Sequence, residues 1–111
     1  MTPALREDLA ARVADYIGRP GDPATIRQAA AHVDVVAEFV HGYVGSGWYG
    51  VDGNPAPGLR AVIVSATARL TTNPEQVATY TAADYSERPT TLTGWTIAEQ
   101  SVLHRYRTRW A

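Results

Sequence analysis

The stretch PATIRQAAAHVDVVAEFVHGYV, residues 23–44, decides the fold. At the spacing of an α-helix its apolar side chains cover more than half of the circumference, and only a narrow polar strip remains. Val35 and Phe39 widen the apolar side beyond what one neighbouring helix would cover. The pattern predicts a long central helix that packs on two sides and meets water along one edge. The polar strip consists of Arg27, Asp34, Glu38 and His41.

A capping residue followed by proline marks the start of two helices, at Thr2-Pro3 and at Asp22-Pro23. The capping side chain accepts a hydrogen bond from a free amide, and proline has no amide hydrogen to leave unpaired. We expect a mainly α fold: a four-helix bundle with a long central helix, in a single domain over residues 1–111. The predicted helices are about 3–17, 23–44, 59–72 and 97–109.

The last predicted helix carries the clearest start signal. Thr96 to Glu99 form a capping box, in which each side chain accepts a hydrogen bond from the backbone amide of the other residue. Arginines in its last turns are favourable at the negative end of the helix dipole. Its apolar side is expected to consist of Ile97, Val102, Leu103 and Tyr106.

Two long connections separate these helices. Residues 45–58 are rich in glycine and predict a flexible loop. Gly45, Gly47 and Gly50 match a dinucleotide-binding pattern, but that pattern requires a preceding strand and a following helix, so we reject this interpretation. Threonines and tyrosines alternate with small residues over 77–94, which predicts a short β-hairpin or extended arm between the third and fourth helices.

Composition excludes several classes of protein. The chain contains no cysteine, which excludes thiolate metal sites, disulfides and cysteine nucleophiles. Ten basic residues, all arginine, and eleven acidic residues give a formal net charge of −1, so no overall field attracts nucleic acid or anionic lipid. The sequence has neither a membrane-spanning run nor the pattern of a signal peptide, and we expect a soluble chain made in the cytoplasm.

The candidate catalytic residues do not form a complete set. Glu38 and His41 have the spacing that places two metal ligands on one helical face, but the carboxylate-bridged sites of helix bundles need further ligands from other helices. His32 lies on the opposite side of the same helix. The serines lack the surroundings of an activated nucleophile. We expect no enzymatic activity, no catalytic residues, no bound metal and no cofactor.

Aromatic residues and arginines instead predict an interaction protein. The tryptophans Trp48, Trp95 and Trp110 fall outside the helix stripes, which favours burial against a partner; alternatively, two of them cap the ends of the monomer core. The tail over 105–110, RYRTRW, suits a protein groove, a solvated helix end or nucleic acid, and we favour the protein partner. From the residues alone, the chain is a helical interaction domain.

Three stretches give a more specific expectation: LRAVIVSATARLTTNPEQV over 59–77, AEFVHGYVGSGWYG over 37–50 and GWTIAEQSVLHRYR over 94–107. In order and spacing they resemble the head-to-tail adaptor (head–tail connector) proteins of bacteriophages, in particular of phages that infect actinobacteria. The resemblance implies a mostly helical virion protein, assembled in the host cytoplasm. It implies a homo-oligomeric ring, commonly of twelve copies, between the portal at the capsid vertex and the tail.

The resemblance also implies the partners of individual segments. The C-terminal segment would engage the portal, while the loop around Trp48 and the arm over 77–94 would contact adjacent subunits or the next head-closure, stopper or tail component. DNA would pass through the lumen without sequence-specific binding. The alternative is a small helical DNA-binding domain that uses the arginine-rich C-terminal helix. The predicted interface residues are Trp48, Tyr49, Tyr80, Tyr85, Trp95, Arg105, Tyr106, Arg107, Arg109 and Trp110.

Overall fold

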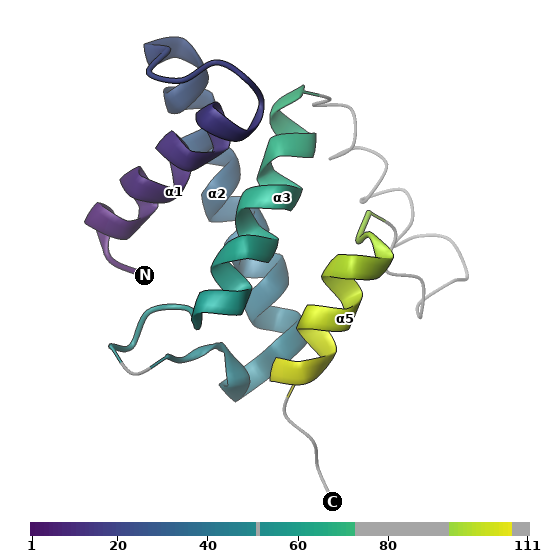
Figure 1. Ribbon diagram of the computed structural model, residues 1–111. Coiled ribbons are helices and arrows are strands. Elements are labelled where there is room, and N and C mark those ends of the chain that lie inside the picture. The colour runs from purple at the N-terminus through teal and green to yellow at the C-terminus, as the bar shows by residue number, and fades with distance from the viewer. Residues whose placement is uncertain (51, 73–93, 108–111) are drawn as a thin grey trace, which may run out of the picture.

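A computed structural model describes residues 1–50, 52–72 and 94–107 (Figure 1). These residues are mainly α-helical, as predicted. The arm expected over 77–94 lies, apart from Gly94, outside the described residues. The helices are α1 (Pro3–Tyr16), α2 (Pro23–Val44), the short 3-10 helix η1 (Gly45–Trp48), α3 (Pro57–Thr72) and α5 (Ile97–Tyr106).

The predicted helix starts are confirmed at atomic detail. The Thr2 hydroxyl accepts a hydrogen bond from the Leu5 amide at 3.2 Å, and the Asp22 carboxylate accepts one from the Thr25 amide at the same distance. Each cap is followed by proline at the first helical position. At the other end of α2, Gly45 adopts a φ of 64°, which terminates the helix where other residues would be strained.

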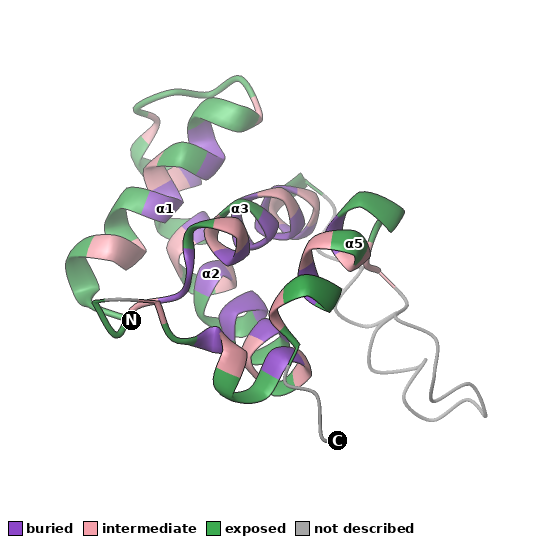
Figure 2. Ribbon diagram, turned by 60° about the horizontal axis from the view of Figure 1, so that its bottom comes forward, coloured by how far each residue is buried: buried purple, intermediate pink, exposed green. Residues whose placement is uncertain are grey.

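The core lies between α1, α2 and α3, and α5 packs against α2 and α3 (Figure 2). In Figure 1, α1 and α5 lie on opposite sides of α3. Because it has neighbours on several sides, α3 is buried on more than one face: Val64 and Ala68 are buried as well as Leu59, Val62, Ile63, Ala66 and Leu70. The largest fully buried side chains are Leu9, Leu59, Ile63, Leu70, Leu103, Val13, Val33, Val36, Val40, Val44, Val62 and Thr67.

Three helix boundaries differ from the prediction. The first helix ends one residue early, at Tyr16, and α3 begins two residues early, because Pro57 occupies a first-turn position where proline is tolerated. The fourth helix was predicted to run to 109, but α5 ends at Tyr106, since Arg107 adopts an extended backbone with φ −65° and ψ 131°.

The apolar side of α5 also differs from the prediction. Leu103 is fully buried and Val102 and Tyr106 pack against the core, but Ile97 is 84% exposed. The inward position of the first turn belongs to Glu99, which faces α3. The prediction that Ile97 belongs to the core is therefore wrong.

The described residues of the 45–58 segment, 45–50 and 52–58, are more ordered than the flexible loop that was predicted. After η1, Tyr49 and Pro55 form an isolated antiparallel bridge. The Gly50 amide donates to the Asn54 carbonyl at 2.7 Å, and the Ala56 amide donates to the Trp48 carbonyl at 3.1 Å. These bonds fold the segment back on itself and lead directly into α3.

None of the helices in the described part of the chain combines the length and the apolar character that a membrane span requires.

Candidate functional site

The C-terminal helix α5 is held on α3 by a partly buried polar lock, which is defined here as Glu99, Arg69 and Ser65. The Arg69 guanidinium donates to both carboxylate oxygens of Glu99, at 2.6 and 2.8 Å, and the Ser65 hydroxyl donates to Glu99 at 2.5 Å. Glu99 is only 4% exposed. A bidentate arginine–carboxylate pair fixes orientation as well as distance, so the lock sets the position of α5 along α3.

The capping box is confirmed, and its glutamate has a second role. The Glu99 amide donates to the Thr96 hydroxyl at 3.1 Å, and the Thr96 amide donates to the Glu99 carboxylate at 3.0 Å. Burial by itself would raise the pKa of Glu99. The hydrogen bonds from Arg69, Ser65 and Thr96 outweigh it and hold that pKa below the ordinary value. Glu99 is therefore ionised in the folded protein at neutral pH.

The other end of α5 fits against two glycines. A Cβ atom added to Gly58 would lie 2.7 Å from the Tyr106 ring, and one added to Gly47 would overlap the Tyr106 carbonyl oxygen. A larger residue at Gly47 would therefore displace the end of α5, whereas one at Gly58 would move the Tyr106 ring. We name the whole surface that receives α5 the α5 seat: Tyr43, Gly47, Gly58, Ser65 and Arg69.

The arginines at the end of α5 point to different surroundings. Arg107 lies over the Tyr43 ring, with 5.0 Å from its guanidinium carbon to the ring centroid, and the Tyr43 hydroxyl is 3.1 Å from His104 Nε2. Arg105 is exposed, and Tyr106 packs against the core. The structure therefore does not gather Arg105, Tyr106 and Arg107 on one outward face.

The aromatic residues expected at an interface separate into buried and exposed ones. Trp48 is only 5% exposed, because η1 turns its indole inward, where it stacks on His41 with ring centroids 4.7 Å apart. The prediction that Trp48 faces a partner is therefore corrected: it is part of the monomer core. Trp95 is half-buried against the same core. Tyr49 is 61% exposed and meets the edge of His41 at 5.7 Å.

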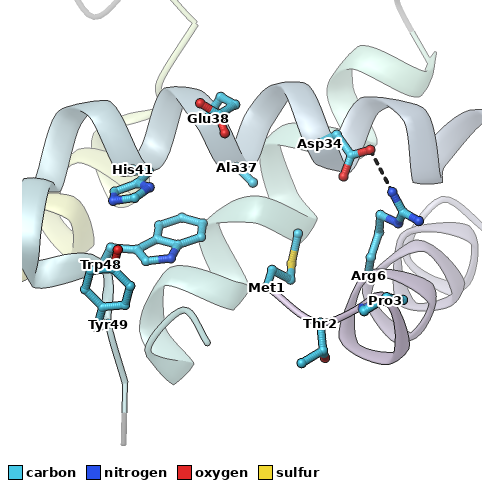
Figure 3. A pocket seen from close by; sticks show the side chains of 10 residues that line it. All are labelled: Met1, Thr2, Pro3, Arg6, Asp34, Ala37, Glu38, His41, Trp48 and Tyr49. Atoms are coloured by element: carbon cyan, nitrogen blue, oxygen red, sulfur yellow. Dashed lines mark hydrogen bonds and ion pairs between the residues drawn. The ribbon is translucent and has the colours of Figure 1, made fainter. Parts of the chain in front are cut away.

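A groove of about 420 Å³ lies between the N-terminal segment and α2 (Figure 3). His41, Trp48 and Tyr49 lie at one end, and the ion pair between Arg6 and Asp34, at 3.0 Å, lies at the other. The remaining lining residues are Met1, Thr2, Pro3, Ala37 and Glu38.

Among the described residues, the groove brings no set of metal ligands together. Glu38 and His41 both line it, as their helical spacing implies. In the described part of the chain, however, no three side chains among histidine, aspartate and glutamate come together as metal ligands. The described chemistry of this face is aromatic stacking and one exposed ion pair.

Four predicted interface residues, Tyr80, Tyr85, Arg109 and Trp110, lie outside the described residues. Conversely, sequence reasoning missed the pairing of Arg69 with Glu99, the stack of His41 on Trp48, and the close approach of Tyr106 to Gly47 and Gly58. The glutamate of the capping box was a usable signal, since a residue at this position can face the neighbouring helix while it caps its own.

Comparisons with known proteins identify no relative of this chain: no protein-family model, no curated protein and no solved structure matches it. The resemblance to head-to-tail adaptor proteins therefore remains a prediction from the three sequence stretches.

Proposed function

We propose that this chain is a structural protein of a bacteriophage particle, a head-to-tail adaptor whose copies form a ring between portal and tail. The observation that carries the proposal lies on α2. Val35 and Phe39 lie one helical turn apart in the middle of this helix and are 38% and 44% exposed, although α2 is otherwise the most apolar helix of the fold. A subunit surrounded by identical copies would cover such a flank.

A closed ring requires two different complementary surfaces on each subunit. The flank at Val35 and Phe39 supplies one of them. Exposed apolar side chains at Tyr49 and Ile97, on other elements, are candidates for the second. In this proposal the arm over 77–94, with Tyr80 and Tyr85, reaches an adjacent subunit or the next head-closure, stopper or tail component.

The ring would contain about twelve copies, as in the family that the sequence resembles, and the tail from Arg105 through Arg109 and Trp110 would contact the portal. A net charge of −1 suits a conduit through which DNA must slide, because a strongly basic lumen would retain the phosphate backbone. The function requires no enzymatic step, metal or cofactor, and it places the protein in the virion after assembly in the host cytoplasm.

The test is cosedimentation with the portal of the same phage. We expect the wild-type protein to cosediment in several copies per portal, and the double variant Val35→Glu/Phe39→Glu to stay folded but fail to form the ring. Arg12→Glu, which changes an exposed residue of α1, is the matched control and should behave as wild type. Normal assembly of the double variant would remove the α2 flank from the interface.

The same preparation tests the alternative of a DNA-binding domain. Such a domain would bind duplex DNA as a monomer or dimer, with an affinity that falls steeply with salt. We expect no duplex binding in a mobility-shift series that starts at about 50 mM salt. Salt-sensitive binding together with no portal association would overturn the adaptor proposal.

A further inference from the structure

Ile97 is the most exposed large apolar side chain in the described part of the chain, at 84%. It lies in the first turn of α5, where it contributes little apolar burial and where isoleucine is a weaker helix former than alanine or leucine. This turn is held in place, because Glu99 completes the capping box with Thr96 and pairs with Arg69. Ile97 is therefore an apolar knob at a fixed position, and the stability of the subunit does not account for it.

The outer face of α2 carries an exposed apolar row that matches such a knob. Val35 and Phe39, at 38% and 44% exposure, are continued along the helix by the exposed residues Ala31 and Gly42. Gly42 has open space where a side chain would otherwise stand. Between packed helices a knob enters a hole formed by four residues of the facing helix. The spacing of such a hole is present in Val35, Glu38, Phe39 and Gly42.

The charges around the two surfaces are complementary. The exposed side chains of α5 include His104 and Arg105 and no acidic residue. Beside the row on α2, the exposed charged residues are Asp34 and Glu38. Asp34 is paired with Arg6, whereas Glu38 has no ion pair with any residue that the structure describes. The outer face of α5 from a second copy would therefore bring positive charge to an acidic border, which favours the correct docking of the two surfaces.

We propose that Ile97 of each copy packs against Val35 and Phe39 of a neighbouring copy, while α5 stays in the seat of its own chain. The knob and the row lie on different helices, so each contact joins two unlike surfaces, as a closed ring requires. This inference rests on the proposed adaptor function and names the contact between its subunits. Arg105 lies about two turns after Ile97, at the border between this contact and the tail that would meet the portal.

Tyr49, the other exposed apolar candidate, suits this role less well. Its ring is 61% exposed, but it already meets the edge of His41 at 5.7 Å and lines the groove beside Trp48. The same groove is lined by Asp34 and Glu38, which also border the row on α2. A contact between Tyr49 and the row of a neighbour would therefore bring like charges together, which is unfavourable.

Cross-linking through introduced thiols tests the contact, because the chain has no native cysteine. Ile97→Cys and Val35→Cys are made as separate single variants and treated with a short bismaleimide in the presence of the portal. We expect a cross-linked dimer when the two variants are mixed, and none when either is treated alone. Tyr49→Cys mixed with Val35→Cys is the matched control and should give no product.

Three results would overturn the inference. A dimer from Val35→Cys alone would show that two copies meet through the same face of α2. Product from the Tyr49→Cys mixture alone would assign the second surface to Tyr49, and no product in any mixture would remove the contact. Cosedimentation of the wild-type protein with the portal is measured separately, so a failure of this contact is distinguishable from a failure of the adaptor function.

Loss of the knob gives a second measurement. Ile97→Ser should weaken association between copies by at least about tenfold in sedimentation velocity, as expected for an isoleucine that is buried on assembly. Its circular dichroism should match wild type, because the side chain is exposed in the subunit. Tyr16→Ser is the control, since it removes a side chain that is 68% exposed at the end of α1. Equal association of the two variants would contradict the contact.

Discussion

The core between α1, α2 and α3 and the α5 seat hold their elements in different ways. The core consists of aliphatic side chains such as Leu9, Val33 and Ile63, which are fully buried. The attachment of α5 adds the ion pair between Arg69 and Glu99, the hydrogen bond from Ser65 and the close approach to two glycines to the burial of Leu103. Apolar burial is non-directional and tolerates small shifts, whereas a bidentate pair fixes one geometry. The core therefore contributes non-directional apolar burial, and the polar contacts of the seat fix the orientation of α5.

The largest expected effect is in the core. Ile63→Ala should lower the free energy of unfolding by about 2–5 kcal/mol, because it leaves a cavity among helices that pack against α3 from several sides. Chemical denaturation followed by circular dichroism measures this. Val35→Ala, a truncation at an exposed position of α2, is the control and should change the value by less than about 0.5 kcal/mol. Equal effects of the two variants would contradict the assigned core.

Loss of the pair between Arg69 and Glu99 should lower the stability of α5 more than that of the other helices. Arg69→Ala removes the partner of a buried carboxylate, which costs about 3 kcal/mol in comparable pairs. We expect faster hydrogen exchange at the amides of α5, with protection in α1, α2 and the middle of α3 retained. Arg60→Ala is the matched control on the same helix, since the pair between Arg60 and Asp52 is more exposed and worth at most about 1 kcal/mol. Uniform loss of protection in the Arg69 variant would show that the two regions are one cooperative unit.

Glycines inside and outside the α5 seat should respond in opposite ways to replacement by alanine. Gly47→Ala should destabilise the protein by about 1–3 kcal/mol, because the added methyl group would overlap the backbone carbonyl of Tyr106. Gly42→Ala, in α2 with open space around it, should instead stabilise the protein by about 0.5–1 kcal/mol through helix propensity. Thermal unfolding of both variants gives the sign directly. Stabilisation by Gly47→Ala would mean that the end of α5 does not lie against Gly47.

The pH dependence isolates the charge of Glu99. Its pKa is lower in the folded than in the unfolded protein, so its contribution to stability is present above the unfolded pKa of about 4.5 and is lost as the pH falls through the lower folded value. Glu99→Gln should therefore lose less stability than wild type over that acidic range. Denaturation series between neutral and acidic pH give the slope of the free energy of unfolding against pH for both proteins. Identical slopes would place the acid sensitivity elsewhere.

A further small effect is expected at a buried hydroxyl of α3. Thr67 is fully buried, and its hydroxyl oxygen has no hydrogen-bond partner among the residues that the structure describes. Thr67→Val keeps the shape and removes the unpaired polar group, so it should stabilise the protein by about 1 kcal/mol. The midpoint of urea unfolding measures the gain. A loss of stability would show that the hydroxyl is paired in solution.

Local signals in the sequence were sufficient for the helices but not for their contacts. Thr2 and Asp22 determine their helix starts through bonds to amides three residues away, so these starts could be predicted without the fold. The pairing of Arg69 with Glu99 joins residues that are far apart in the chain, and their spacing carries no sign of it.

The candidate interface was harder to predict for the same reason. Trp48 lies outside every helix stripe and was therefore assigned to a partner, but η1 and the bonds after it turn the indole back onto His41. Ile97 was assigned to the core because of its apolar side chain, although Glu99 occupies the inward position. Both errors arise where a non-local contact determines which way a side chain points.

The mass of the complex between the wild-type protein and the portal of its phage tests the adaptor function most directly. Native mass spectrometry at saturating protein should show an increase of several copies of the 12.0 kDa chain, twelve for a ring that matches a twelvefold portal. A portal that gains one copy or none would contradict the proposal that this helical domain is a ring-forming adaptor.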